Sequence, residues 1–450
     1  MATIPLITQS LNDLNIAQNA ANTTINLFQH FDDPLTTGKI ARFELYDSSL
    51  GGGVSNVLLF DQPGAGAPET VNNFLNYVND GDYVNSIIHR SIPGFVIQGG
   101  GFTFKNLMVD LVPTDPPIVN EFNSQRSNTR GTIAMAKVGN DPNSATSQWF
   151  FNLADNSANL DNQNGGFTVF GEVLSQGDLA PIDAIASLPV EDASSFLNQP
   201  ALTDVPVNIE SSSAIDDSDN NLVRYRNISV SQTDELKFKV IHNSNPDLVQ
   251  VSLNQAELSL DYADNRNGRA EIIIQATDLQ GDSVVDSFDL TVGNVQPYPT
   301  NRGATIYRFL NNDTGVHLYT ASKIERDHIL NNLPNYKLES LAYASIDNLT
   351  GNPAPQKVYR FLNKDTGTHL YTLSEVEKQS VETNLKNFTL ETESLFAYAQ
   401  AQPNSIPVYR FYNTQTGAHF YTPSEVERNV VEDTLPNYNP EGIAYYALPI

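Results

Sequence analysis

The strongest constraint on the fold is a pattern that occurs three times in the last third of the chain. Segments that begin Tyr-Arg-Phe start at Tyr307, Tyr359 and Tyr409, spaced by 52 and 50 residues. Each continues through a Thr-Gly dipeptide to a His and a Tyr-Thr pair. Repeats of this length are typical of units that bury their apolar faces against one another. The pattern therefore predicts a threefold α+β module over residues 305–450.

Each repeat carries the signals of a strand, a hairpin turn, a short helix and a second strand. The Tyr-Arg-Phe segment is rich in strand-forming residues, and Thr-Gly marks the turn. A Ser followed three residues later by a Glu is the capping box that opens a helix. These pairs are Ser322 and Glu325, Ser374 and Glu377, and Ser424 and Glu427.

The middle of the chain has a period of two. Apolar residues alternate with polar ones in four short runs, and turn-forming segments such as "DNRNG" separate the runs. This pattern predicts a small antiparallel sandwich of the immunoglobulin or cadherin kind over residues 207–294. The alternating residues are Leu236, Phe238 and Val240; Leu258, Leu260 and Tyr262; Ile272, Ile274 and Ala276; Phe288, Leu290 and Val292.

The first part of the chain reads as a further β-rich domain over residues 39–189. Runs such as "KIARFELYD", "GTIAMA" and "FTVFGEVL" predict strands, and one helix is expected from Pro68, where Val71, Phe74 and Val78 form an apolar stripe. The remaining segments are assigned as an N-terminal extension and two linkers, which cover residues 1–38, 190–206 and 295–304. The chain is thus predicted to be mainly β and multidomain.

The charge of the chain limits its partners. It has 450 residues, with 25 Lys and Arg against 52 Asp and Glu and a net charge of -27. Nucleic acid is excluded, because its binding depends on basic surface. No apolar run approaches the roughly 20 residues that span a bilayer, and no secretory signal is visible, so a soluble chain is expected. The absence of cysteine excludes disulfides and thiolate chemistry.

One short stretch places a cation among apolar residues. In "IIHRSIPGFVIQGGGF", residues 87–102, Arg90 precedes a Pro and an apolar run that ends in three glycines. The segment resembles the signature of the cyclophilin-type peptidyl-prolyl isomerases. The similarity continues over residues 39–180, through "TVNNFLNYV", "GTIAMAK", "TSQWFFNLADN" and "GGFTVFGEVL" in the order of the family.

The resemblance implies a fold, an activity and a set of site residues. The fold would be an eight-stranded β-barrel capped by helices, and the activity would be cis–trans isomerisation of X-Pro bonds in peptide or protein clients, without cofactor or metal. The positions that match the catalytic residues of the family are Arg90, Phe95, Gln98 and Phe150. Those that match its substrate-binding residues are Val96, Ala136, Gln148 and Leu160. His89 is taken as structural.

Elementary chemistry agrees with this implication. The barrier to X-Pro rotation is amide resonance of roughly 18–20 kcal/mol, so no nucleophile is needed. A catalyst must exclude water from the prolyl ring and offer a donor to the twisted amide. The guanidinium of Arg90 is permanently charged and carries several donors in a rigid fork.

Several features have a less specific explanation. Arg90 could be a surface arginine, and Phe95 and Phe150 could be ordinary core residues. The family has a bulky aromatic and a His where this sequence has Asn159 and Phe167, so substrate preference is expected to differ. Lys137 is loosely aligned with an asparagine of the peptide groove.

Other possibilities remain open for the C-terminal parts. The acidic segment 216–221 could hold calcium, but it lacks the Gly and Glu spacing of an EF-hand, which favours a solvated turn. The repeated His317, His369 and His419 could converge on zinc, although a local role in each repeat is favoured.

The repeats resemble modules at the C-termini of secreted bacterial enzymes, which favours an extracytoplasmic or secreted bacterial protein over a cytoplasmic one. They leave room for a glycan or surface partner through residues 305–450. The alternative function is adhesion or glycan binding by a surface protein whose barrel holds proline-containing peptides without turnover.

Overall fold

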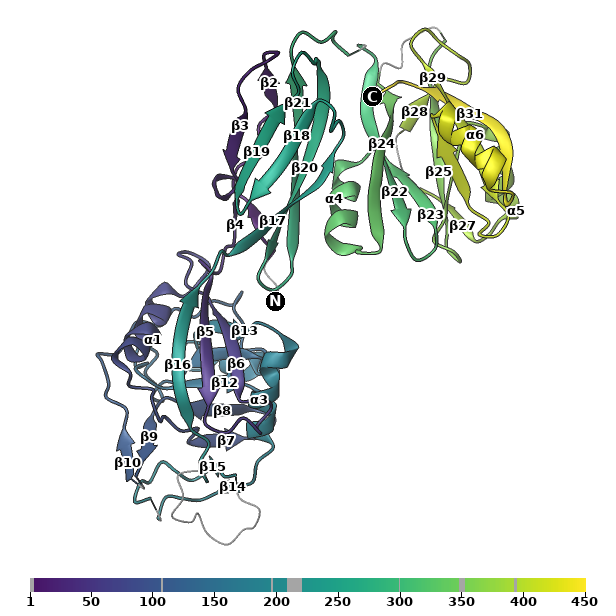
Figure 1. Cartoon of the computed structure of the whole chain (residues 1–450). Helices are drawn as coiled ribbons and strands as arrows, with labels where there is room; N and C mark the ends of the chain where they lie inside the picture. The colour runs from purple at the N-terminus through teal and green to yellow at the C-terminus, as the bar shows by residue number, and fades with distance from the viewer. Residues whose placement is uncertain are drawn as a thin grey trace. The chain divides into compact units, whose positions relative to one another are not determined.

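A computed structural model describes residues 4–106, 108–195, 197–208, 221–298, 300–347, 353–391 and 395–450. Strands predominate, as the sequence predicts (Figure 1). Contacts divide the chain into two compact units. The first comprises residues 1–9, 27–238 and 276–283, and the second comprises residues 10–26, 239–275 and 284–450.

An eight-stranded antiparallel sheet forms the first unit and confirms the predicted barrel-like fold. Its strands, in spatial order, are β16 (Tyr225–Gln232), β5 (Lys39–Leu45), β6 (Val54–Leu59), β13 (Val169–Val173), β11 (Thr132–Met135), β12 (Trp149–Asn152), β8 (Val96–Gly99) and β7 (Arg90–Ile92). The two ends of this order approach each other, because Ile87, just before β7, bridges Arg224, just before β16. The sheet therefore curls around a core.

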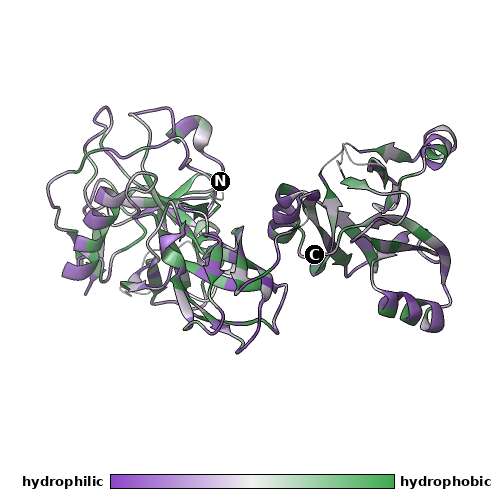
Figure 2. Cartoon of the chain, turned by 90° about the horizontal axis from the view of Figure 1, so that it is seen from above, coloured by the Kyte–Doolittle hydropathy of each residue, from purple (hydrophilic) through white to green (hydrophobic). Residues whose placement is uncertain are grey.

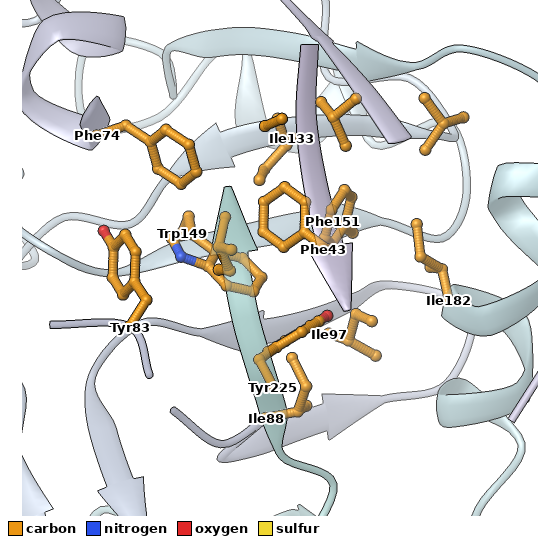
Figure 3. Packing of buried hydrophobic residues seen from close by; sticks show 14 of the residues in the cluster. Phe43, Phe74, Tyr83, Ile88, Ile97, Ile133, Trp149, Phe151, Ile182 and Tyr225 are labelled. Carbon is orange, nitrogen blue, oxygen red and sulfur yellow. The ribbon is translucent and has the colours of Figure 1, made fainter. Parts of the chain in front are cut away.

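Aromatic and branched side chains fill that core (Figure 3). Phe43 contacts Trp149 and Phe151 edge to face, with ring centroids 5.2 and 5.4 Å apart. Successive residues of a strand point to opposite faces, so Trp149 and Phe151 of β12 face inward while Phe150 faces outward. The alternation leaves the outer face of β12 available for a site.

Helices α1 (Pro68–Asp80) and α3 (Gln176–Ala186) belong to the same unit. The predicted helix from Pro68 is confirmed, and it buries Val71, Phe74 and Tyr77 in the barrel core. It ends at Gly81, whose left-handed φ of 77° suits a residue without a Cβ. The smaller elements of the unit are β1 (Leu6–Ile7), η1 (Leu27–Gln29), β4 (Phe31–Asp32), β9 (Phe102–Lys105), β10 (Met108–Leu111), α2 (Ser157–Leu160), β14 (Val190–Glu191) and β15 (Val205–Pro206).

The domain borders in the structure differ from those predicted from the sequence. The β16 segment, expected in the sandwich, pairs with β5 from Tyr225↔Leu45 to Gln232↔Lys39 and completes the barrel sheet. Residues 190–206, expected as a linker, form the β14–β15 ribbon and bury Ala193, Leu202 and Val205 against Ile87 and Phe102. The segment is hence an insertion before the last barrel strand.

Two sheets build the predicted sandwich, and the N-terminal segment completes both. One contains β17 (Leu236–Asn243), β20 (Gly268–Asp278), β21 (Ser283–Val292) and β2 (Leu14–Ile16); the other contains β18 (Val249–Asn254), β19 (Glu257–Tyr262) and β3 (Thr23–Asn26). β2 and β3 belong to the segment expected as an extension, and they pair with β21 and β19. Along the ribbons of the whole chain, stretches of hydrophobic and hydrophilic residues follow one another closely (Figure 2).

The C-terminal part contains three successive groups of strands, each with one helix. Their elements are β22 (Arg302–Asn311), β23 (Val316–Thr320), α4 (Lys323–Asn332) and β24 (Tyr336–Ile346); β25 (Gln356–Asn363), β26 (His369–Thr372), α5 (Glu375–Asn384), β27 (Phe388–Leu390) and β28 (Leu395–Ala397); β29 (Ile406–Asn413), β30 (His419–Thr422), α6 (Glu425–Thr434) and β31 (Tyr438–Ala447). Ser322, Ser374 and Ser424 each accept a hydrogen bond from the predicted capping-box glutamate three residues on.

Three buried tyrosines join these groups into a closed ring. The hydroxyl of Tyr319 donates to the carbonyl of Tyr421, that of Tyr371 to the carbonyl of Tyr319, and that of Tyr421 to the carbonyl of Tyr371. Each hydroxyl also accepts a hydrogen bond, at 2.9–3.0 Å, from the backbone amide of the same tyrosine to whose carbonyl it donates. Each group is therefore hydrogen-bonded to both of the others.

Within the described residues, none of the helices has the length and apolar character needed to span a membrane.

Candidate active site

The strand register aligns four residues across one face of the barrel sheet. Arg90 of β7 lies opposite Gln98 of β8, Gln98 lies opposite Phe150 of β12, and Phe150 lies opposite Ala134 of β11. Directly opposed residues in an antiparallel sheet point to the same side. The period of two thus places a cation, an amide and an aromatic ring in one row.

An apolar cluster surrounds this row on the outer face. Val96, Phe150 and Leu160 are 2%, 4% and 5% exposed, and Phe95 and Ala136 are half-buried beside them. The half-buried Phe167 ring packs edge to face on Phe150, with centroids 5.8 Å apart. We call this group, Phe95, Val96, Ala136, Phe150, Leu160 and Phe167, the proline cup. Five of its six members are predicted site residues; the sixth is the phenylalanine where the family has a His.

Arg90 lies at the edge of the proline cup and is half-buried. Among the described residues, its guanidinium has no hydrogen bond to another side chain and no carboxylate within 4.0 Å. The backbone of Arg90 forms an isolated β-bridge with Asp204, and the amide of Ser91 donates to the Asp204 carbonyl at 2.8 Å. The insertion at residues 190–206 thus lies along β7, a neighbour that sequence reasoning missed because no local pattern links the two segments.

Gln98 and Gln148 are joined by a hydrogen bond in which the Gln98 amide donates to the Gln148 side-chain oxygen at 2.8 Å. Next to them His89 is 4% exposed, and burial and the charge of Arg90 lower its pKa to about 4. His89 is therefore a neutral ring at physiological pH, packed edge to face on Phe102 with centroids 5.0 Å apart. This agrees with the structural role expected for it.

A buried amide network holds the wall of the proline cup. Asn156, just before α2, donates to the Phe95 carbonyl at 2.8 Å and to the Asn152 side chain at 2.8 Å. Asn152 donates in turn to Asn128, whose amide donates to Asp161 at 2.8 Å. The network fixes both ends of the segment that carries Leu160. Sequence reasoning missed these residues, although the Asn-rich "NLADN" motif was a signal.

Lys137 follows Ala136 at the end of β11 and borders the proline cup. Its ammonium lies 4.8 Å from the centroid of the Phe167 ring and donates to the carbonyls of Asn164 and Gly166 at 2.9 and 2.6 Å. Burial lowers the pKa of Lys137 to about 8, opposed by the charge of Asp141. Asn159 is exposed on α2.

The repeated histidines have separate local partners in the described part of the chain. His317, His369 and His419 pair with Glu339, Glu391 and Glu441, at 3.0, 3.3 and 3.4 Å. No group of three metal-ligating side chains occurs among residues that the structure describes. The zinc alternative is accordingly not supported, and the calcium alternative at 216–221 falls almost wholly outside the described residues.

Comparison with known proteins points to one family for the barrel. Residues 56–209 match the family model described as cyclophilin type peptidyl-prolyl cis-trans isomerase, and residues 299–448 match a domain of unknown function (DUF5648). A solved cyclophilin-type isomerase of Cryptosporidium parvum aligns over 44% of this chain and 99% of its own, with 20% identity and a TM-score of 0.30.

Bacterial relatives are more similar in sequence. The chain is 41% identical to peptidyl-prolyl cis-trans isomerase A of Dickeya dadantii over 33% of this chain and 74% of that protein. It is 46% identical to peptidyl-prolyl cis-trans isomerase B of Escherichia coli over 25% of this chain and 69% of that protein. With these identities spread over most of the relatives' length, the chain belongs to the cyclophilin-type peptidyl-prolyl cis-trans isomerases.

Proposed function

We propose that the barrel accelerates cis–trans rotation of X-Pro bonds, with Arg90, Phe95, Gln98 and Phe150 as its catalytic residues. The observation that carries this assignment is the place of Arg90 in the strand register, opposite Gln98 and in one row with Phe150, together with a guanidinium that has no ion pair among the described residues. A protein with net charge -27 has many carboxylates to neutralise an arginine, and Arg90 has none within 4.0 Å among the described residues.

The chemistry follows from amide resonance. As the X-Pro bond twists, conjugation is lost and the prolyl nitrogen regains its lone pair, so a donor placed there stabilises the transition state more than the planar ground state. Arg90 supplies that donor without changing its protonation. Exclusion of water by Phe95 and Phe150 strengthens this interaction, because charge is screened less in an apolar site.

The remaining predicted residues hold the peptide. Val96, Leu160 and Phe150 form an apolar floor on which the pyrrolidine ring can rest. Gln148 fixes the amide orientation of Gln98, and Ala136 gives a small side chain at the groove edge, where an extended peptide needs room. Proline-containing peptides or protein clients are thus the partners of this face.

The test measures cis-to-trans relaxation of a proline tetrapeptide. Removal of one preorganised electrostatic donor costs roughly 10²–10³-fold in rate, so Arg90→Ala is expected to lower kcat/KM by about that factor. Arg42→Ala, on the exposed face of β5, is the matched control and should retain full activity. If the wild-type protein leaves the uncatalysed rate unchanged, the isomerase assignment fails and the adhesion alternative replaces it.

We further propose that residues 305–450 direct the isomerase to a surface or glycan partner of an extracytoplasmic or secreted bacterial protein. The support is three exposed aliphatic residues at the same position of the three helices: Ile324, Val376 and Val426 are 84%, 80% and 75% exposed. The same exposed aliphatic position on each helix offers a partner three equivalent apolar contacts.

A binding assay with the full chain tests this targeting proposal. Wild-type protein and an Ile324→Ser, Val376→Ser, Val426→Ser variant are applied to a glycan array and to intact bacterial cells. Retention of the wild type and loss of the variant are expected, with isomerase activity unchanged in both. Equal retention of the two proteins, or retention of neither, would contradict the proposal.

A further inference from the structure

A second cation without a counter-ion among the described residues lies beside the proline cup. Lys137 is half-buried, and no carboxylate lies within 4.0 Å of its ammonium in the described part of the chain. Lys39 and Lys378 pair with Asp61 and Glu375, whereas Lys105 has no carboxylate within 4.0 Å among the described residues. Lys137 differs from an exposed unpaired lysine such as Lys105 in that its ammonium lies beside an aromatic ring of the proline cup.

The local contacts fix where the ammonium lies. Two of its three N–H groups donate to the carbonyls of Asn164 and Gly166, and the Phe167 ring lies 4.8 Å away. Phe167 itself rests on Phe150, in the proline cup. The charge is therefore held at the rim, and its third N–H has no partner among the described residues.

Strand order sets the separation between the two cations. Arg90 is on β7, and Ala136, which precedes Lys137, follows β11, three strands away. Strands are spaced by about 4.8 Å, and Ala136 lies two residues beyond Ala134, which is in register with Arg90. The backbones at Arg90 and Ala136 are therefore roughly 16 Å apart, the length of about five residues of extended peptide. A client whose proline lies near Arg90 can place a side chain two to four residues away beside Lys137.

We infer that Lys137 forms a carboxylate-binding subsite, so that the enzyme prefers clients with an Asp or Glu two to four residues from the proline. The inference rests on the isomerase activity proposed above and adds a substrate class to it. A client carboxylate accepts the third N–H of the ammonium, for which the described residues provide no acceptor. Burial lowers the pKa of Lys137 to about 8, and the charge of Asp141, which lies beyond 4.0 Å, acts in the opposite direction.

The experiment uses the full chain and nine-residue blocked peptides with a central proline. Glu, Gln or Lys is placed in turn at each of the four positions on either side, and cis–trans exchange is followed by NMR. In at least one register, kcat/KM for the Glu peptide should exceed that for the Lys peptide by about fivefold, the upper range for a partly exposed ion pair.

Three variants separate recognition of charge from support of the loop. Lys137→Gln should reduce the Glu-to-Lys ratio to about one, because the hydrogen-bonding side chain stays while the charge is removed. Lys137→Arg should keep most of the preference. Lys105→Gln, an exposed lysine of β9, makes the same change in net charge away from the cup and should leave the ratio unchanged.

The outcomes distinguish the two proposals. If every peptide is isomerised at the same rate, or if Lys137→Gln keeps the wild-type ratio, the carboxylate subsite is wrong and the isomerase assignment stands. If no peptide is accelerated, the isomerase assignment itself fails.

Discussion

Gln148 shows how one residue can act on catalysis through another. Its side-chain oxygen accepts the Gln98 amide at 2.8 Å, and Gln98 lies opposite Arg90 in the β7–β8 register. Loss of one neutral hydrogen bond costs about 1 kcal/mol, so Gln148→Ala should lower kcat/KM for a proline peptide by about fivefold. A fall as large as that of Arg90→Ala would show instead that Gln148 contacts the reacting amide.

His89 predicts a pH dependence of stability rather than of catalysis. Its folded pKa of about 4 lies below the ordinary value of 6.5, so the unfolded chain binds the proton more tightly. The resulting stability is complete above pH 6.5 and is lost as pH falls toward 4, by up to about 3 kcal/mol.

Urea unfolding at several pH values measures this contribution of His89. The difference in unfolding free energy between wild type and His89→Gln should shrink from pH 7 to pH 4, because the variant has no ring to protonate. A difference that stays constant over this range would contradict a buried neutral imidazole.

At the scale of single elements, helix α5 depends on its cap. The Ser374 hydroxyl accepts the Glu377 amide at 3.1 Å, one of the first-turn donors that have no partner within the helix. Ser374→Ala should therefore lower the free energy of unfolding by about 1 kcal/mol in urea. Gln379→Ala, at an exposed position of α5, should have no such effect.

Strand β16 shows that a local sequence pattern predicts a strand but not the sheet to which the strand belongs. Ile228 is buried, whereas Ser229 and Gln232 are exposed, as expected for an edge strand with one apolar face. Such a run fits a barrel and a sandwich equally well, and only its hydrogen bonds to β5 decide between them. For the same reason the sequence did not predict strands β2 and β3, which lie in a polar N-terminal segment and pair with β21 and β19 of the sandwich.

At the scale of the whole molecule, the tyrosine ring makes the C-terminal groups interdependent. Arg308 reinforces this closure, because it pairs with Glu427 of the last group at 2.9 Å. Tyr421→Phe would leave the amide and carbonyl of Tyr371 without partners in a buried site, at a cost of about 3 kcal/mol.

Hydrogen exchange measures whether the loss of stability in Tyr421→Phe extends to all three C-terminal groups of strands. In the Tyr421→Phe variant, protection should fall in all three groups, from β22 to β31, rather than near residue 421 alone. Tyr412→Phe removes a hydroxyl that has no hydrogen bond among the described residues, and protection should stay at the wild-type level. Exchange confined to the third group would show that the groups are stable separately.

Local pattern determined most of the elements of this protein. Period-two runs, the Pro68 helix start and the capping serines each specify structure through neighbours within a few residues, so they can be read without a fold. The cyclophilin-like motifs likewise contain five of the six side chains that pack together in the proline cup. What only the tertiary structure decided is which distant segments share a sheet, which cation lacks a counter-ion and how three groups close into a ring. These features depend on contacts between residues that are far apart in the chain. Such contacts produce no periodic pattern in the sequence, so they cannot be predicted from it.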